Sequence, residues 1–224
     1  MIITIDGPAG SGKSSTARAV ASTLRIRHLD SGAFYRALTL AALQAGIPAD
    51  DWDGLSAPAL DRLGVAGRPG PDGYSLGIAG VDVTAELRSE IVNAHVSRMA
   101  GVPAVRRWLH GTLRDAATGV DLVADGRDMG TVVFPEADIK IFLTCSLETR
   151  ARRRLLERGH HQPDTALLAA EIENLDRRDR LDSERELAPL RPAPDAVHLD
   201  TTGLTFDEQV NAVIALVTPL LSSG

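Results

Sequence analysis

The N-terminal residues contain the feature that most restricts how this chain can fold. Residues 7–14 read Gly-Pro-Ala-Gly-Ser-Gly-Lys-Ser, which matches the phosphate-binding pattern G-x-x-x-x-G-K-[ST]. Apolar residues before this segment predict a strand over 2–6, and residues 14–24 predict a helix. A glycine-rich turn without a ligand is the alternative. The strand–loop–helix context favours a phosphate loop (P-loop), whose backbone N–H groups and helix N-terminus face an anion.

The residues of this loop are predicted to bind a nucleoside triphosphate. Lys13 would reach the β and γ phosphates, and the Ser14 hydroxyl would be a magnesium ligand. Of 24 basic residues only Lys13 and Lys140 are lysines, and a compact ammonium suits the phosphates better than a guanidinium. The predicted triphosphate-binding residues are Gly7, Pro8, Ala9, Gly10, Ser11, Gly12, Lys13, Ser14 and Ser15.

Length and composition restrict the class of protein. A chain of 224 residues predicts one large domain, or one domain with a smaller insert. The formal net charge of −6 predicts a surface that repels nucleic acid and anionic membranes, so neither is an expected partner. A single cysteine, Cys145, fits a reducing, cytoplasmic location. We expect no signal peptide, and the apolar residues 210–221 are too few to span a bilayer.

Hydrophobic periodicity predicts strands that alternate with helices. The predicted strands are residues 2–6, 26–29, 120–125, 139–144 and 197–200, and the predicted helices are residues 14–24, 33–45, 147–158, 165–182 and 206–221. This alternation predicts an α/β fold in which a parallel sheet carries helices on both faces.

One segment interrupts the alternation. Residues 63–84 are rich in glycine and proline, which predicts a small antiparallel β meander inserted into the α/β domain. Within the insert, residues 74–78 and 81–83 are the predicted strands. After it, residues 86–99 are predicted to form one helix that returns to the core.

Three further clusters of polar residues are candidates for a second anion site. They occupy residues 30–36, 123–130 and 178–185. The first two clusters follow predicted strands directly, as the P-loop does. Because ligands of an open parallel sheet bind outside the carboxyl ends of its strands, these clusters are predicted to surround one crevice.

The residues in these clusters resemble one family. The P-loop, the Asp-Ser-Gly-Ala-Phe-Tyr-Arg of residues 30–36 and the Asp-Gly-Arg-Asp-Met-Gly-Thr-Val-Val-Phe-Pro of residues 125–135 are similar to bacterial cytidylate kinases. The Pro-Ala-Val-Arg of residues 103–106 and the Arg-x-x-x-Asp-x-x-Arg of residues 178–185, followed by Ala-Pro-Leu, are also similar. The likeness runs nearly end to end and includes the glycine-rich insert. It implies transfer of the γ-phosphoryl group of ATP to CMP or dCMP in pyrimidine nucleotide metabolism, with Mg²⁺ as cofactor.

The resemblance also implies the residues that bind CMP. It assigns the cytosine to Ser31, Arg106, Asp128 and Arg185, the phosphate to Arg36 and Arg127, and the ribose to Arg178 and Asp182, with Tyr35 lining the pocket. Lys13, Arg127 and Arg178 are the implied catalytic residues. Tyr35 has an alternative role as a core aromatic residue whose hydroxyl lies at the rim.

The chemistry of cytosine agrees with this assignment. Its N4 amine is a donor that requires an acceptor such as Asp128 or the Ser31 hydroxyl, and an arginine can donate to its N3 and O2 acceptors. Uracil instead carries an acceptor, O4, in place of the N4 amine and a donor at N3, so both contacts would be mismatched. A site with buried unpaired polar groups rejects such an analogue strongly. For Arg106 and Arg185, solvated charge on a helix is the alternative.

Two other features bear on the triphosphate. Asp125 ends a mostly apolar strand, which is typical of a carboxylate that holds Mg²⁺ through water, while a structural cap is the alternative. The basic residues Arg150, Arg153, Arg154 and Arg158 share one helical face. They predict a lid over ATP, in preference to a solvated basic face.

The resemblance implies one kinase domain over residues 1–224. Its core would comprise residues 1–30 and 115–224, its CMP-binding region residues 31–114, and its lid residues 150–165. A monomer is expected. An adenylate or shikimate kinase of the same fold is the nearest alternative, and a non-catalytic nucleotide-binding module would be expected to lack some of the arginines. A regulatory GTPase would need an Asn-Lys-x-Asp motif, which the sequence does not contain.

Overall fold

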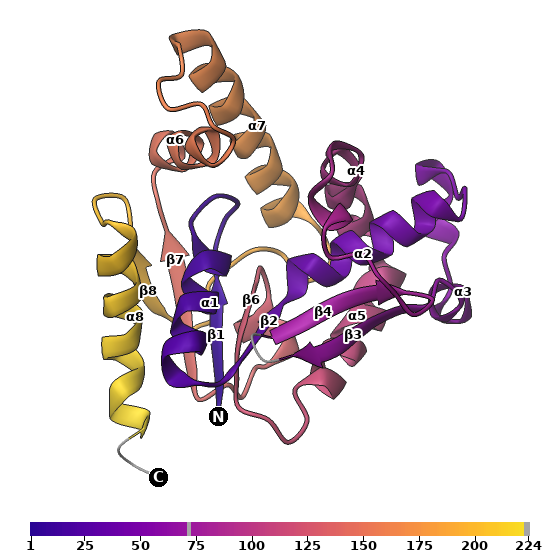
Figure 1. Ribbon diagram of the computed structural model, residues 1–224, viewed down its shortest axis with the longest axis horizontal. Coiled ribbons are helices and arrows are strands. Elements are labelled where there is room, and N and C mark those ends of the chain that lie inside the picture. Colours follow the sequence, from indigo (N-terminus) through magenta and orange to yellow (C-terminus); the bar gives the residue numbers. More distant parts are fainter. Residues whose placement is uncertain (71–72, 222–224) are drawn as a thin grey trace.

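A five-stranded parallel sheet forms the centre of the structure, a computed structural model that describes residues 1–70 and 73–221 (Figure 1). The strand order is β2-β6-β1-β7-β8, and every neighbouring pair is parallel. The strands are β1 (Ile2–Asp6), β2 (Arg27–Asp30), β6 (Leu122–Gly126), β7 (Ile139–Thr144) and β8 (Val197–Asp200). The predicted parallel α/β fold is confirmed, and the P-loop leaves the central strand β1.

Helices cover both faces of this sheet, as predicted. The helices α1 (Lys13–Leu24) and α8 (Phe206–Leu221) pack on one face, and α2 (Ser31–Gln44) and α5 (Pro103–Ala116) on the other. Successive strand residues point to opposite faces. Ile3, Ile5 and Val123 therefore belong to one buried cluster, whereas Leu29, Leu122 and Ala124 belong to the other.

The glycine-rich insert forms the predicted antiparallel meander. Its strands are β3 (Val65–Gly70), β4 (Gly73–Ile78) and β5 (Val81–Asp82), paired in the order β3-β4-β5. The first of them was not predicted, and Pro71 of the insert lies outside the described residues. The small sheet packs closely on α2, since a Cβ atom at Gly67 would lie 2.7 Å from Cζ of Phe34.

The single helix predicted over residues 86–99 is wrong. A 3₁₀ turn η2 (Glu86–Arg88) and a helix α4 (Glu90–Gly101) are separated by Ser89, which is extended with φ −58° and ψ 156°. The break lets the Leu87 carbonyl accept a hydrogen bond from Arg36. The turn η1 (Ala49–Gly54) and the helices α3 (Ala57–Arg62) and α5 were not predicted as elements.

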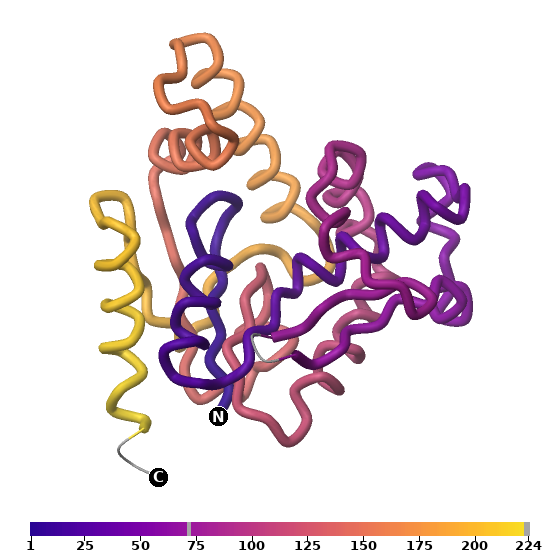
Figure 2. The backbone as a smooth tube through the Cα atoms, viewed as in Figure 1, coloured from indigo at the N-terminus to yellow at the C-terminus, as the bar shows by residue number. Residues whose placement is uncertain are grey.

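Two helices rise above the sheet beside the P-loop. They are α6 (Leu147–Glu157) and α7 (Thr165–Glu184), and the side chains of Ser146 and Asp164 cap their N-termini by accepting backbone N–H bonds. In Figure 2 the α6–α7 pair stands above the P-loop, while α2, α4 and the small sheet lie to its right, and the end of α7 reaches toward α4. Within the described chain, no helix is both long and apolar enough to cross a membrane.

Candidate functional site

The P-loop is held in shape by the last helix of the chain. Gly12 has a φ of 83°, and a Cβ atom there would lie 2.9 Å from the amide nitrogen of Gln209. That amide donates to the Thr16 hydroxyl at 2.5 Å and to the Ser11 carbonyl at 3.5 Å. The α8 helix thereby fixes the loop and the start of α1 from behind.

The outer side of the loop is held by α6 and α7. The guanidinium of Arg150 donates to the Ala9 carbonyl at 2.9 Å and to Asp179 at 2.5 Å, and Asp179 accepts the Ala9 backbone N–H at 3.2 Å. Arg150 is only 5% exposed. It therefore braces the loop and is not free to act as a mobile lid cation.

The ammonium of Lys13 lies within the loop, where its Nζ donates to the Pro8 carbonyl at 3.3 Å. Burial and the nearby positive charge of Arg127 lower the pKa of Lys13 to about 7. An anion bound in the loop would favour the charged ammonium, because it would offset both effects.

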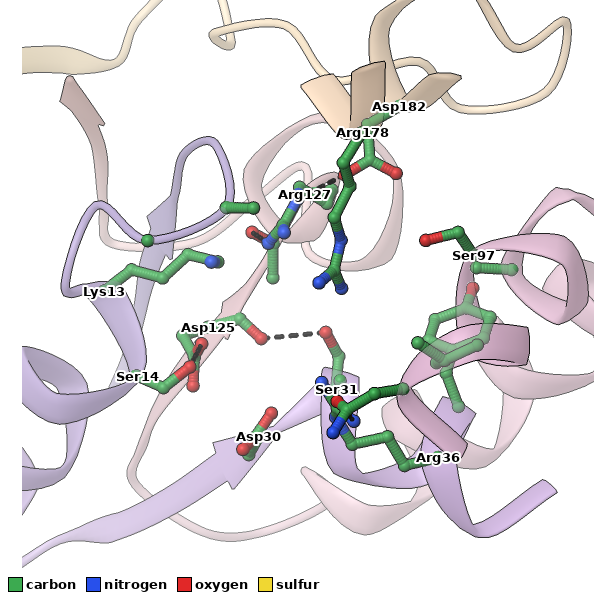
Figure 3. A pocket seen from close by; sticks show the side chains of 18 of the residues that line it. Lys13, Ser14, Asp30, Ser31, Arg36, Ser97, Asp125, Arg127, Arg178 and Asp182 are labelled. Carbon is green, nitrogen blue, oxygen red and sulfur yellow. Dashed lines mark hydrogen bonds and ion pairs between the residues drawn. The ribbon is translucent and has the colours of Figure 1, made fainter. Parts of the chain in front are cut away.

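Ser14 and Asp125 meet beside the P-loop, as the sequence predicted. The Ser14 hydroxyl donates to Asp125 Oδ2 at 2.5 Å (Figure 3). On the other side of this carboxylate, His28 Nε2 lies 2.8 Å from Asp125 Oδ1. Burial and the Asp125 charge raise the pKa of the adjacent Asp30.

These side chains could hold a magnesium ion. Hydroxyl and carboxylate oxygens are the ligands that Mg²⁺ takes, so the residues present fit this ion. Among the described residues, no group of three or more His, Cys, Asp or Glu could hold a metal by itself. Phosphate and water would therefore supply the remaining ligands.

A basic wall lines the cavity next to the P-loop and consists of Arg36, Arg127 and Arg178. Arg127 Nε donates to Asp182 at 2.8 Å (Figure 3). The guanidinium of Arg36 donates to Asn93 at 2.6 Å. The buried Nε atom of Arg178 has no hydrogen-bond partner among the described residues. An anionic ligand would supply one.

The same wall is electrostatically unfavourable without an anion. Burial, and then the charge of Arg88, lower the pKa of Arg36 to about 10. Burial, and then the charge of Arg127, lower the pKa of Arg178 to about 10. Cations held this close together in a partly dry site favour a ligand with several negative charges.

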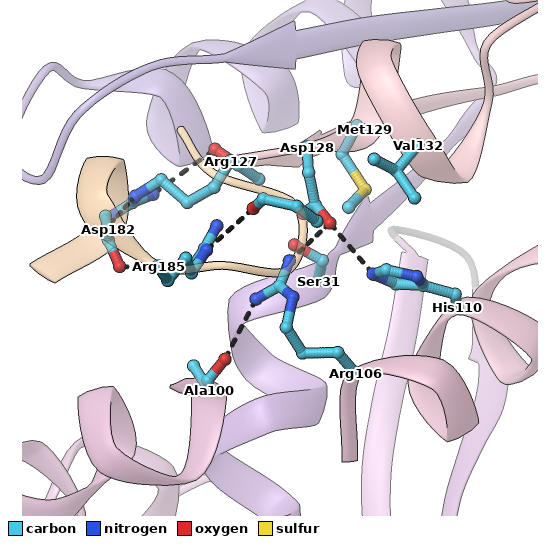
Figure 4. A network of polar contacts seen from close by, with 12 residues as sticks. Ser31, Ala100, Arg106, His110, Arg127, Asp128, Met129, Val132, Asp182 and Arg185 are labelled. Atoms are coloured by element: carbon cyan, nitrogen blue, oxygen red, sulfur yellow. Dashed lines mark hydrogen bonds and ion pairs between the residues drawn. The ribbon is translucent and has the colours of Figure 1, made fainter. Parts of the chain in front are cut away.

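A buried charge pair lies at the far end of the site. Asp128 and Arg106 are 2% and 1% exposed, and Arg106 Nη2 donates to Asp128 Oδ2 (Figure 4). Arg106 Nη1 donates to the Ala100 carbonyl at 3.1 Å, while its buried Nε has no partner among the described residues. The alternative of a solvated helix charge is therefore wrong for Arg106.

Ser31, Tyr35 and Arg185 complete this end of the site. The Ser31 hydroxyl donates to the Asp125 carbonyl at 2.8 Å. The Tyr35 ring lies 5.5 Å from the Arg106 guanidinium, and its buried hydroxyl lacks a partner among the described residues. Arg185 is 9% exposed and donates from Nε to the Ala188 carbonyl at 2.7 Å, so it is not a solvated charge either.

One cavity of about 490 Å³ joins the P-loop to this charge pair. The predicted site residues that line it are Ala9, Gly10, Gly12, Lys13, Ser14, Ser15, Ser31, Tyr35, Arg36, Arg106, Asp125, Arg127, Asp128, Arg178, Asp182 and Arg185. Gly7, Pro8 and Ser11 belong to the loop but do not line the cavity. The predicted crevice at the carboxyl ends of β1, β2 and β6 therefore exists.

Other lining residues were missed by the sequence reasoning. Asn93 and Ser97 come from α4, and Arg88 comes from the turn before it. No motif surrounds these residues, and they reach the cavity because α4 packs on α2. Asp30 stood inside a recognised cluster, and its place between a strand and a helix N-terminus was the signal that could have identified it.

The four arginines of the predicted lid have different surroundings. Arg154 and Arg158 line the cavity, and both pair with Glu171, at 3.2 and 2.9 Å. Arg153 instead donates to the Thr201 and Leu204 carbonyls, away from the cavity lining. Only two of the four therefore remain candidates for contact with a triphosphate.

Comparison with known proteins agrees with this geometry. The family model for cytidylate kinase matches residues 3–219. A cytidylate kinase from Mycobacterium avium is 47% identical, covering 97% of this chain and 95% of its own length. Another from Geobacillus thermodenitrificans is 45% identical, covering 96% of this chain and 95% of its own length. In fold alone, an uncharacterised protein from Eubacterium ventriosum aligns with a TM-score of 0.52 at 12% identity over 98% of each chain. The chain belongs to the cytidylate kinase family.

Proposed function

We propose that this protein transfers the γ-phosphoryl group of ATP to CMP or dCMP, giving ADP and CDP or dCDP. The observation that carries the proposal is the single cavity lined by both the P-loop and the buried pair of Asp128 and Arg106. A kinase must hold two anionic substrates in line, and the basic wall between these two ends is suited to the phosphates.

The far end of the cavity suits cytosine. Asp128 offers an acceptor for the N4 amine, and the unpartnered donors of Arg106 and Arg185 suit its N3 and O2 atoms. Uracil would bring an acceptor toward a carboxylate, which is a repulsive contact in a buried site. AMP would need more room and a different donor pattern. These features support cytosine over the other common bases.

The reaction requires little covalent chemistry from the protein. Arg36 and Arg127 would bind the CMP phosphate, Asp182 the ribose, and Lys13 the β and γ phosphates. Arg178 faces the space between them, where charge spreads in the transition state. In-line placement and neutralisation of charge would account for most of the acceleration.

Mg²⁺ would be held by the Ser14 hydroxyl and, through water, by Asp125, with His28 keeping the carboxylate in place. When bound, the ion neutralises and orients the triphosphate. We further propose a monomer in the cytoplasm with no nucleic-acid partner. The single cysteine fits a reducing compartment, and the net charge of −6 argues against binding to nucleic acid. Light scattering at micromolar concentration would test the monomer.

A coupled assay of ADP formation tests the activity. With ATP and Mg²⁺, CMP and dCMP should be turned over at least tenfold more efficiently than UMP, AMP or shikimate. Faster turnover of AMP or shikimate would instead assign the chain a different acceptor. Formation of ADP without any acceptor, at the same rate as with CMP, would exclude a CMP kinase.

A further inference from the structure

His110 lies behind the base end of the cavity and has no role in the function proposed above. It is on α5, one turn after Arg106, and is 6% exposed. It does not line the cavity, whereas Asp128 does. A buried histidine that contacts a ligand-facing carboxylate from behind can act on the ligand only through that carboxylate.

The contacts of Asp128 are unequal for its two oxygens. His110 Nε2 lies 2.9 Å from Oδ2, and Arg106 Nη2 also donates to Oδ2 (Figure 4). No described residue donates a hydrogen bond to Oδ1. The two donors come from neighbouring turns of one helix, so they hold the same oxygen from one side.

The charge state of Asp128 defines what His110 must do. Burial raises the pKa of Asp128, but the His110 hydrogen bond and the Arg106 charge outweigh it and bring the pKa below the ordinary value. An ionised carboxylate only accepts hydrogen bonds. The Nε2 atom of His110 therefore carries a hydrogen and donates it.

The alternative arrangement of this pair explains why a second donor matters. Guanidinium and carboxylate groups favour a bidentate pairing in which two N–H groups take both oxygens. Such a pairing would engage Oδ1 of Asp128 with Arg106 and leave it one acceptor position fewer for an exocyclic amine. With His110 on Oδ2, Arg106 keeps a single oxygen and its Nε remains unpartnered.

We propose that His110 is a positioning residue for base selection, which holds Oδ2 of Asp128 so that Oδ1 stays available to the N4 amine of cytosine. This inference rests on the proposed CMP kinase activity. His110 acts on the affinity for the acceptor base and on the choice between cytosine and uracil. It has no part in ATP binding, because the P-loop lies at the other end of the cavity.

The test compares His110→Leu with His110→Gln. Leucine fills the space without a donor, whereas the glutamine amide nitrogen can reach about as far as imidazole Nε2. In His110→Leu the KM for CMP should rise roughly 10- to 100-fold, the range for a lost hydrogen bond to a charged group. The ratio of kcat/KM for CMP over UMP should fall by a similar factor. The kcat at saturating CMP and the KM for ATP should change less than about threefold. His110→Gln should recover most of the CMP affinity and of the base preference.

Matched controls separate positioning from packing. Leu109→Ala removes a fully buried side chain from the same helix without touching Asp128, so it should lower the Tm and leave the CMP/UMP ratio unchanged. Should His110→Leu fail to fold, His110→Asn replaces it, because its shorter amide cannot reach Oδ2 and should lose the preference that His110→Gln keeps.

Two outcomes would overturn the inference. One is a donor-less His110 variant that folds and keeps the wild-type CMP affinity and CMP/UMP ratio. The other is equal loss in the donor-less and glutamine variants for CMP and ATP alike, which would mean a purely structural role. A wild-type protein that does not phosphorylate CMP would instead defeat the proposed function, and this result is visible before any variant is made.

Discussion

At the scale of single residues, the site combines cations and carboxylates that are costly to bury without a ligand. Lys13 and Arg178 have lowered pKa values, chiefly because burial removes them from water. Arg178 also retains a buried donor without a partner among the described residues. The protein maintains these groups in a cavity, and a bound nucleotide would satisfy them together.

Lys13→Ala should abolish phosphoryl transfer while leaving the fold intact. Lys13 is the cation placed in the P-loop, and cationic groups that stabilise this type of transition state are worth about 10³–10⁵ in rate. Single-turnover kinetics and a thermal melt would measure both effects. Lys140→Ala is the matched control, because this lysine pairs with Asp195 outside the cavity lining and should leave kcat unchanged. Retention of more than about a tenth of the wild-type kcat by Lys13→Ala would contradict the assignment.

Replacing both Asp128 and Arg106 by alanine should remove the preference for CMP over UMP, mostly through loss of CMP activity. The double change avoids leaving one partner charged and buried, which would cost several kcal/mol by itself. The ratio of kcat/KM for the two substrates is the measurement. Arg107→Ala, an exposed neighbour on the same helix, is the control. If the double variant still prefers CMP by the wild-type ratio, the base is recognised elsewhere.

At the scale of elements, the π-helical turn η3 (Met129–Val133) follows directly after Arg127 and Asp128 and anchors this segment to the sheet. Its first backbone N–H groups, of Met129 and Gly130, donate to the two oxygens of Asp6 at 2.9 and 2.8 Å. Asp6 ends the central strand β1, so one side chain links the P-loop strand to the segment that presents Arg127 and Asp128.

Asp6 should make stability depend on pH in an unusual direction. Burial raises the pKa of Asp6 to about 7, above the value near 4 of an unfolded aspartate. Between these values the folded state binds the extra proton, so the free energy of unfolding falls as pH rises from about 4 to 7 and then levels off. Relative to that of Asp6→Asn, the free energy of unfolding of the wild type should fall by up to roughly 4 kcal/mol across this interval.

Urea denaturation of both proteins at several pH values between 4.5 and 8 would measure this difference. Asp138→Asn is a control, since Asp138 also accepts a backbone N–H but at an exposed position. A wild-type stability that stays level relative to Asp6→Asn over the same interval would show that Asp6 stays ionised when folded.

At the scale of the whole molecule, the two ends of the acceptor site belong to different segments. Arg36 lies on α2, and Arg106 lies on α5, with the small sheet and α4 between them in the sequence. Arg36 is held by Asn93 of α4, which couples the phosphate end to this intervening region. Kinases exclude water by closing such segments over their substrates.

We expect CMP binding to draw the segments around the insert together. CMP would contact Arg36 through its phosphate and Arg106 through its base. Both contacts can form at full strength only when the segments that carry these two arginines are drawn together. Hydrogen exchange with and without CMP should show increased protection within residues 60–110. The α8 helix, behind the sheet, is the internal control and should not change. A purely structural insert predicts unchanged protection over residues 60–110.

Elements and motifs with local signals could be predicted before the structure was known. The P-loop, the strands at residues 2–6, 139–144 and 197–200, and the polar clusters after β2 and β6 follow from periodicity and from glycine, lysine and aspartate spacing over a few residues. Strand-end clusters were predictable as one site because parallel strands end at the same edge of a sheet.

Roles that depend on contacts between distant segments could be read only from the folded chain. Arg150 and Arg154 share one helical face in the sequence, but only packing on α7 showed that the first braces the P-loop and the second lines the cavity. Asn93 reaches Arg36, and His110 reaches Asp128, across gaps that no local pattern spans. Such roles arise from long-range packing, because a side chain's partners are set by the fold around it and not by its neighbours in sequence.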